Sequence, residues 1–197
     1  MGRRQEVSNE RILEVARRCF LLRGAGVSAV EIAGELGVSH TTIFNRFGSK
    51  EALMIAALGV PDQIEWASVL EKGPDNRPVF EQLVQHGKVV AAYFQNLQAG
   101  LAVLHAAGIP NDKIFPDQTA DSAPAKAFMA LVAWLRVAQS QGRIGKCDVE
   151  TLASTILGAL YNWAQTASVC GHSTTRDDSE SHVERFIELL WNGIGVE

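Results

Sequence analysis

The residues of this chain whose types and spacing suit chemistry gather in one polar stretch, HTTIFNRFGSK, from His40 to Lys50. Arginine pairs with guanine and asparagine with adenine through two hydrogen bonds each, and threonine offers a hydroxyl or methyl group to a base edge. Lys50 follows Ser49, a residue that suits a helix N-cap, so the lysine lies where the helix dipole disfavours a cation. A bound phosphate would make that position favourable, because a helix N-terminus is already an anion site. The stretch therefore suits contact with a nucleic acid.

Two plainer readings of the same stretch stay open. The helix can be an ordinary surface helix whose polar side chains are solvated. Lys50 can extend into water or pair with Glu51, at a penalty of a few tenths of a kcal/mol.

Other chemistries lack their residue patterns. The five histidines and three cysteines are scattered, with no HExxH or CxxC spacing, so neither a metal site nor a cofactor is expected. There is no phosphate loop, nucleophile motif or pair of catalytic carboxylates, so we do not expect an enzyme. The longest strongly apolar run, Phe128 to Leu135, is much shorter than the roughly 20 residues that cross a bilayer, so no membrane partner is expected. Three distant cysteines in a chain without a secretory signal indicate a reducing cytoplasm.

The charge is unevenly distributed along the chain. Residues 1–50 carry eight basic and five acidic side chains, a net charge of +3, whereas the rest carries ten basic and seventeen acidic side chains, a net charge of −7. The first quarter therefore suits a polyanion as partner and the remainder does not.

The elements that would position the polar stretch are helices. Apolar residues recur at helical spacing between Glu10 and Arg23, and Ser28-x-x-Glu31 reads as a capping box that starts a second helix, ended by Gly37. Ser39 suits the N-cap of a third helix, residues 40–47. Two short helices joined by a glycine-containing turn are the pattern of a helix-turn-helix.

Helical patterns also fill the rest of the chain. A fourth helix is expected over residues 50–72, kinked or split near Pro61, and longer helices over residues 79–107, 125–141, 148–170 and 179–192. Residues 108–124 read as a loop. The sequence thus predicts an all-α protein of about nine helices.

The segments RILEVARRCFLLRG and VEIAGELGVSHTTIFNRFGSKEAL resemble the TetR family of bacterial transcriptional regulators. The resemblance is close over about residues 11–58, and beyond them only the order of helices and loops matches. It implies an N-terminal three-helix DNA-binding domain, residues 1–50, and a larger helical ligand-binding and dimerisation domain, residues 51–197.

The resemblance also assigns roles to side chains. Thr42 and Lys50 fall on phosphate-contacting positions, and His40, Thr41 and Asn45 on positions that meet base edges, with Arg46 able to reach either. Phe44 departs from the tyrosine that is usual there and lacks its hydroxyl. Either Val27 or Ser28 matches the family's usual threonine, and the capping box favours Ser28. The complete set of expected DNA-binding residues is Ser28, Ser39, His40, Thr41, Thr42, Phe44, Asn45, Arg46 and Lys50.

The larger domain is expected to bind a small molecule and to dimerise. Aromatic and polar side chains suit an apolar pocket with a few polar groups, although most of them can equally be core. The candidate ligand-binding residues are Trp66, His86, Tyr93, Phe94, Phe128, Trp134, Asn162 and Trp163. The last two helices carry wide apolar faces that suit a four-helix dimer interface, the alternative being intramolecular core. The candidate interface residues are Leu157, Leu160, Phe186, Leu190 and Trp191.

The sequence therefore predicts a homodimeric, cytoplasmic regulator, a repressor that binds a palindromic site on double-stranded DNA and is released by a small-molecule effector. The alternative is a helical interaction or small-molecule-binding protein without sequence-specific DNA binding.

Overall fold

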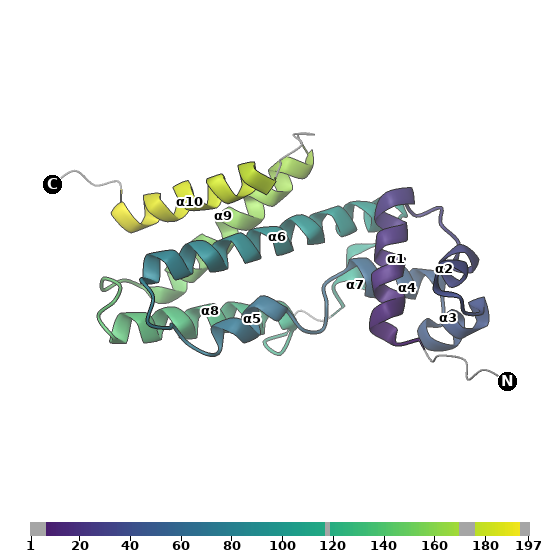
Figure 1. The fold of residues 1–197 in the computed structure, drawn as a ribbon, viewed down its shortest axis with the longest axis horizontal. Coiled ribbons are helices and arrows are strands. Elements are labelled where there is room, and N and C mark those ends of the chain that lie inside the picture. The colour runs from purple at the N-terminus through teal and green to yellow at the C-terminus, as the bar shows by residue number, and fades with distance from the viewer. Residues whose placement is uncertain (1–6, 117–118, 170–175, 194–197) are drawn as a thin grey trace. The chain divides into compact units, whose positions relative to one another are not determined.

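The computed structural model describes residues 7–116, 119–169 and 176–193, which form ten helices and no strand (Figure 1). The predicted all-α class is confirmed. In chain order the helices are α1 (Asn9–Arg23), α2 (Ala29–Leu36), α3 (His40–Phe47), α4 (Lys50–Leu58), α5 (Glu65–Leu70), α6 (Val79–Ala106), α7 (Asn111–Ile114), α8 (Ala123–Ser140), α9 (Val149–Val169) and α10 (Arg176–Asn192).

Two differences from the predicted helices have local causes. The helix expected over residues 50–72 is split into α4 and α5, because Gly59 ends α4 in an extended conformation and Pro61 has no N–H with which to continue the ladder. The short α7 lies in the segment expected to be a loop. None of the described helices combines the length and apolar character needed to cross a membrane.

The chain divides into two compact units, of which the first comprises Met1–Pro61 and Ala99–Asp117. Helices α1 to α4 of this unit each begin at a serine whose side chain accepts a backbone N–H of the first turn: Ser8, Ser28, Ser39 and Ser49. The predicted caps at the last three serines are confirmed. The inward side chains of the four helices are at most 1% exposed, and burial of each contributes about 1.5–3 kcal/mol: Ile12, Phe20, Ile32, Ile43 and Leu53.

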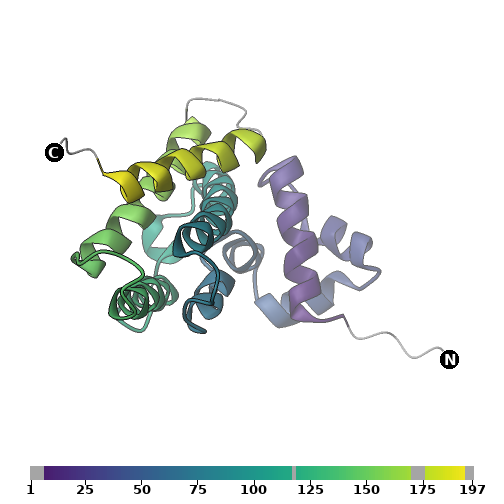
Figure 2. The ribbon, with the colours of Figure 1, turned by 60° about the vertical axis from the view of Figure 1, so that its left-hand side comes forward.

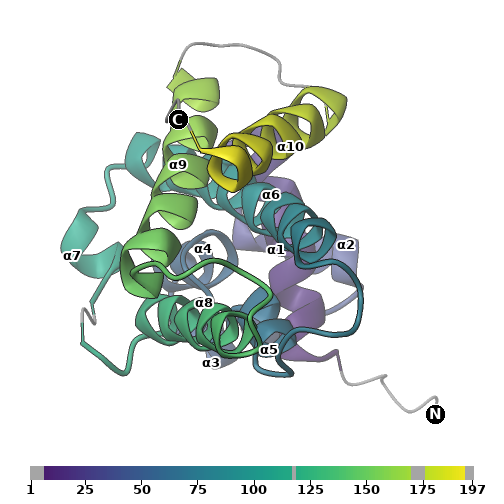
Figure 3. The same cartoon turned by 90° about the vertical axis from the view of Figure 1, so that its left-hand side faces the viewer.

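The second unit comprises Asp62–Gln98 and Gln118–Glu197. Within it α6 lies between the α5–α8 side and the α9–α10 side (Figures 1 and 3), and one hydrophobic core joins all five helices. Helices α9 and α10 cross (Figure 2), and the stacked rings of Trp163 and His182, 4.9 Å between centroids, lie between them. Gly87 allows α10 to approach α6, because a Cβ there would lie 2.7 Å from Cγ1 of Val183. The expected functional boundary at residue 50 concerns which residues bind DNA, and it stays a prediction.

Candidate nucleic-acid interface

The turn between α2 and α3 is built from residues that local geometry requires. Ser28 and Glu31 form the expected capping box: the Glu31 N–H donates to Ser28 Oγ at 3.2 Å, and the Ser28 N–H donates to Glu31 Oε2 at 2.8 Å. That backbone hydrogen bond is the main reason why the pKa of Glu31 lies below its ordinary value. Gly37 ends α2 at φ 67°, a left-handed conformation that favours glycine.

Helix α3 presents one buried side chain and a polar outer face. Ile43 is buried, whereas the outer face carries four exposed side chains: His40, Thr41, Phe44 and Asn45. The rings of His40 and Phe44 meet edge to face, 6.3 Å between centroids. The three residues expected at base edges therefore lie on one accessible helix.

Ser39 and Thr42 form a pair at the start of α3. The Thr42 N–H donates to Ser39 Oγ at 3.2 Å, and the two hydroxyl oxygens lie 2.9 Å apart. Both residues are among the expected DNA contacts. Their mutual hydrogen bond orients the Thr42 hydroxyl at the positive end of the helix, a position that suits a phosphate.

Arg46 has a structural partner that the sequence did not reveal. Its guanidinium donates to the carbonyl of Val7 and, at 3.2 Å, to Oδ1 of Asn9. These contacts join the end of α3 to the start of α1. In this arrangement Arg46 supports the helix that carries the candidate base-reading residues.

Lys50 is also directed toward the protein itself. Its ammonium group donates to the carbonyl of Ala25 at 2.6 Å, in the turn between α1 and α2, and the residue is only half-exposed. Glu51 pairs instead with Lys113 at 2.6 Å. The cation that seemed misplaced at a helix N-terminus thus satisfies a carbonyl oxygen 25 residues earlier in the chain.

Part of the positive charge of the first 50 residues is already neutralised. Glu35 forms ion pairs with Arg18 and Arg23, each at 2.7 Å, and accepts a hydrogen bond from the Cys19 thiol at 3.3 Å. The bond from Arg18 is the main reason why the pKa of Glu35 is lowered, and burial is the main reason why that of Cys19 is raised. These arginines therefore stabilise the α1–α2 contact in the unbound protein.

In the second unit the residues expected to bind a ligand form aromatic contacts. Trp66 meets Tyr93, Tyr93 meets Phe94, and His86 meets Trp134, with ring centroids 5.4–6.3 Å apart. Trp66 and His86 also line a cavity of about 390 Å³ beside α5. Burial lowers the pKa of His86, helped by the nearby charge of Arg77. Six of the eight candidates line neither this cavity nor the one described next: Tyr93, Phe94, Phe128, Trp134, Asn162 and Trp163. The role of all eight as ligand contacts stays a prediction.

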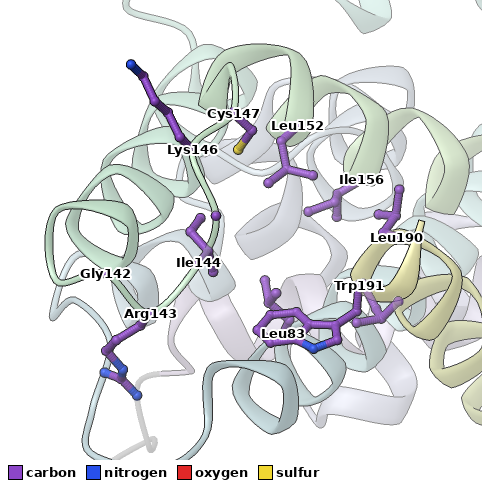
Figure 4. Close-up of a pocket in the computed structure, with 12 residues that line it drawn as sticks. Leu83, Gly142, Arg143, Ile144, Lys146, Cys147, Leu152, Ile156, Leu190 and Trp191 are labelled. Carbon is purple, nitrogen blue, oxygen red and sulfur yellow. The ribbon is translucent and has the colours of Figure 1, made fainter. Parts of the chain in front are cut away.

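A cavity of about 450 Å³ lies elsewhere in the second unit, and we name it the end cavity (Figure 4). Its lining residues are Leu83, Gly142, Arg143, Ile144, Gly145, Lys146, Cys147, Leu152, Ile156, Ile187, Leu190 and Trp191. Sequence reasoning missed it, because a loop, residues 142–147, supplies half of the lining and has no periodic pattern.

The residues expected at a dimer interface differ in exposure. Leu160 is fully buried, and Leu157, Phe186 and Leu190 are half-buried against the core of their own unit. Trp191 is exposed, and its ring meets Phe80 at 5.7 Å between centroids. Leu160 is thus a core residue of the single chain, and the role of the other four residues in a dimer interface stays a prediction. In the part of the chain that the structure describes, no cluster of side chains suits a metal ion.

Solved structures of known proteins share this helical fold. Solved structures with this fold include a putative TetR-family transcriptional regulator from Mesorhizobium loti MAFF303099, at TM-score 0.69 and 17% identity over 97% of this chain and 100% of that chain. Salmonella enterica GusR has a TM-score of 0.62 and 22% identity, over 96% of this chain and 100% of that chain. A putative transcriptional regulator from Saccharomonospora viridis in complex with choline has a TM-score of 0.64 and 24% identity, over 91% of this chain and 94% of that chain. No curated protein matches the chain.

The chain therefore has the helical fold of these solved structures, with an N-terminal helix-turn-helix. Residues 12–57 match the family model of bacterial regulatory proteins, tetR family. The predicted resemblance is confirmed.

Proposed function

We propose that the protein is a dimeric transcriptional repressor that binds a palindromic DNA site through α3 and is released when a small molecule enters the second unit. The observation that carries the proposal is the exposed face of α3, where His40, Thr41 and Asn45 lie together. These side chains can donate to and accept from base edges in the major groove. Thr42 and Lys50, at the starts of α3 and α4, are the proposed phosphate contacts.

In this proposal the DNA site is a palindrome because the dimer has two-fold symmetry. Two copies of α3 related by a two-fold axis would enter successive major grooves, about 34–36 Å apart. An effector lowers the affinity for DNA only if it binds more tightly to a conformation in which the two helices miss that spacing. The choline-bound relative supports a small molecule as effector, without fixing its identity for this chain.

The experiment is to select binding sites from random double-stranded DNA with the full-length protein and to measure affinity for the selected site against salt. Contact with several phosphates predicts that the logarithm of the affinity falls linearly with the logarithm of the salt concentration. Asn45→Ala is expected to cost about 1–3 kcal/mol at one base pair and to relax preference there, whereas Thr42→Val is expected to weaken binding to all sequences alike.

A matched control is Ser68→Ala, which removes an exposed hydroxyl from α5. Recovery of no consensus site, together with affinity that ignores salt, would point to the alternative, a helical interaction or small-molecule-binding protein.

A further inference from the structure

The end cavity has apolar walls that come from four parts of the second unit. Leu83 of α6, Ile156 of α9 and Ile187 of α10 are buried beneath it, while Leu152 and Leu190 are half-buried at its sides. Figure 4 shows Trp191 lying across one side, with Ile144 of the loop facing it. A volume of about 450 Å³ falls within the range of about 300–1,000 Å³ that is usual for small-molecule sites.

Such a hollow leaves its lining without dispersion partners on one side, because protein interiors are otherwise close-packed. An aliphatic body that fills it regains those contacts and removes apolar surface from water. The walls offer few groups that could hold a polar ligand body. The apolar part of the ligand is therefore the part that belongs inside the cavity.

The charged residues of the end cavity are all basic. Arg143 and Lys146 are its charged lining residues, and no carboxylate lines it, although the chain as a whole has a net charge of −4. The Arg143 guanidinium is held by the carbonyls of Asp75, at 2.6 Å, and Arg77, so it is a fixed positive charge. Lys146 extends outward from the rim in Figure 4, and no carboxylate among the described residues pairs with it.

A neighbouring cavity shows the opposite charge. It lies between α6 and α10 and is lined by three carboxylates and one ammonium group, together with apolar side chains: Phe80, Glu81, Val84, Gln85, Lys88, Glu184 and Glu188. Lys88 is already paired with Glu184 at 2.5 Å. An anion is thus favoured at the end cavity and disfavoured beside it.

We propose that the end cavity binds a free single-chain amphiphile whose aliphatic tail lies against Ile156, Leu190 and Trp191 and whose anionic headgroup lies at the rim near Lys146. Charge complementarity selects the headgroup, and the apolar walls select the tail. Binding at this site does not depend on the proposed regulatory function. Only the step from binding to a change in DNA affinity rests on it.

The experiment uses the full-length protein and three probes that share one tail: dodecanoate, dodecanol and dodecyltrimethylammonium, each below its micellar concentration. Binding is followed by calorimetry and by the fluorescence of Trp191, whose change is isolated by comparison with Trp191→Phe. Dodecanoate is expected to bind at least about tenfold more tightly than the cationic probe, the factor that corresponds to one well-placed charge contact.

Two kinds of variant separate the contributions of headgroup and tail. Lys146→Glu is expected to reverse the preference between anionic and cationic probes, whereas Lys126→Glu, an exposed lysine of α8 outside the cavity, is expected to leave it unchanged. Ile144→Trp and, separately, Leu152→Phe are expected to fill the cavity and weaken dodecanoate binding. Their thermal unfolding confirms that each variant is folded, and two independent variants guard against a single unfolded one.

Equal affinity for the three probes, or an equal response to Lys146→Glu and Lys126→Glu, would overturn the proposal. So would binding to phosphatidylglycerol vesicles with no binding of monomeric dodecanoate. Sedimentation of the same variants tests whether a second copy of the chain occupies the cavity. If Ile144→Trp changes the mass of the oligomer and leaves dodecanoate binding unchanged, the proposal is also overturned.

DNA affinity is then measured with and without dodecanoate. If the protein binds no DNA under any condition, the proposed regulatory function fails while the amphiphile site stands.

Discussion

Lys50 illustrates how one side chain can serve both the unbound protein and a DNA complex. Its ammonium is bound to the Ala25 carbonyl at 2.6 Å, so the lysine already joins the start of α4 to the α1–α2 turn. It remains half-exposed, and a phosphate can share the three donors of an ammonium group. The two roles are therefore compatible, and they predict different measurable effects.

We predict that Lys50→Ala lowers the free energy of unfolding by about 1–2 kcal/mol, because a charge-assisted hydrogen bond is lost. Chemical denaturation in the absence of DNA measures this effect. Lys126→Ala is the matched control, since the ammonium group of this exposed lysine has no hydrogen-bond partner among the described residues. Unchanged stability of the Lys50 variant, with weaker DNA binding, would mean that the lysine acts on phosphate alone.

At this scale the sequence predicted local partners and missed distant ones. The serine caps and the Ser28–Glu31 box join residues three positions apart, and their geometry follows from the helix itself. The acceptors of Lys50 and Arg46 are mainly backbone carbonyls 25 and 39 positions away. Any residue supplies a carbonyl, so no residue type in the sequence marks such a partner.

Among the elements, α4 and the last turns of α6 approach each other within the first unit more closely than side chains would allow. A Cβ at Gly100 would lie 2.3 Å from the carbonyl oxygen of Leu58, at the end of α4. The contacted atom belongs to the backbone, so it cannot turn away. Glycine at this position thus permits the contact between the two helices.

Gly100→Ala is therefore expected to destabilise the first unit by about 1–3 kcal/mol, the usual range for overpacking. Gly34→Ala is the control, because this glycine in the interior of α2 has open space around its Cβ. The control is expected to be neutral or up to about 1 kcal/mol stabilising, since alanine favours helix more than glycine does. Hydrogen exchange of α4 amides reports the local effect, and equal protection in both variants would contradict it.

Element positions were largely predictable because they follow from periodicity and end signals. The spacing of apolar residues and the glycines at helix ends predicted the positions of α1 to α3. Gly59 and Pro61 predicted the interruption between α4 and α5. The helical turn of α7 and the end cavity were missed. A four-residue helix is too short for a periodic pattern, and a cavity depends on which segments meet in three dimensions.

For the whole molecule, the proposed recognition of a palindrome depends on the proposed dimer through α9 and α10. Leu160 cannot test it, because this side chain is fully buried in its own unit and its replacement would damage the fold. Tyr161 of α9 and Leu189 of α10 are better probes, since both are exposed apolar side chains. A core stripe and an interface stripe look alike in sequence, and only exposure in the folded chain separates them.

We predict that Tyr161→Glu combined with Leu189→Glu converts the dimer to a monomer, because two carboxylates per chain would be buried against apolar surface. Sedimentation velocity measures the mass. Affinity for the full palindrome is expected to fall at least about a hundredfold, because binding of one subunit no longer holds the second subunit near its half-site. Affinity for a single half-site is expected to stay the same.

The control is Met129→Glu with Val137→Glu, two comparably exposed apolar residues of α8. If both pairs leave a dimer, then α9 and α10 do not form the interface. If both dissociate it, the interface extends to α8.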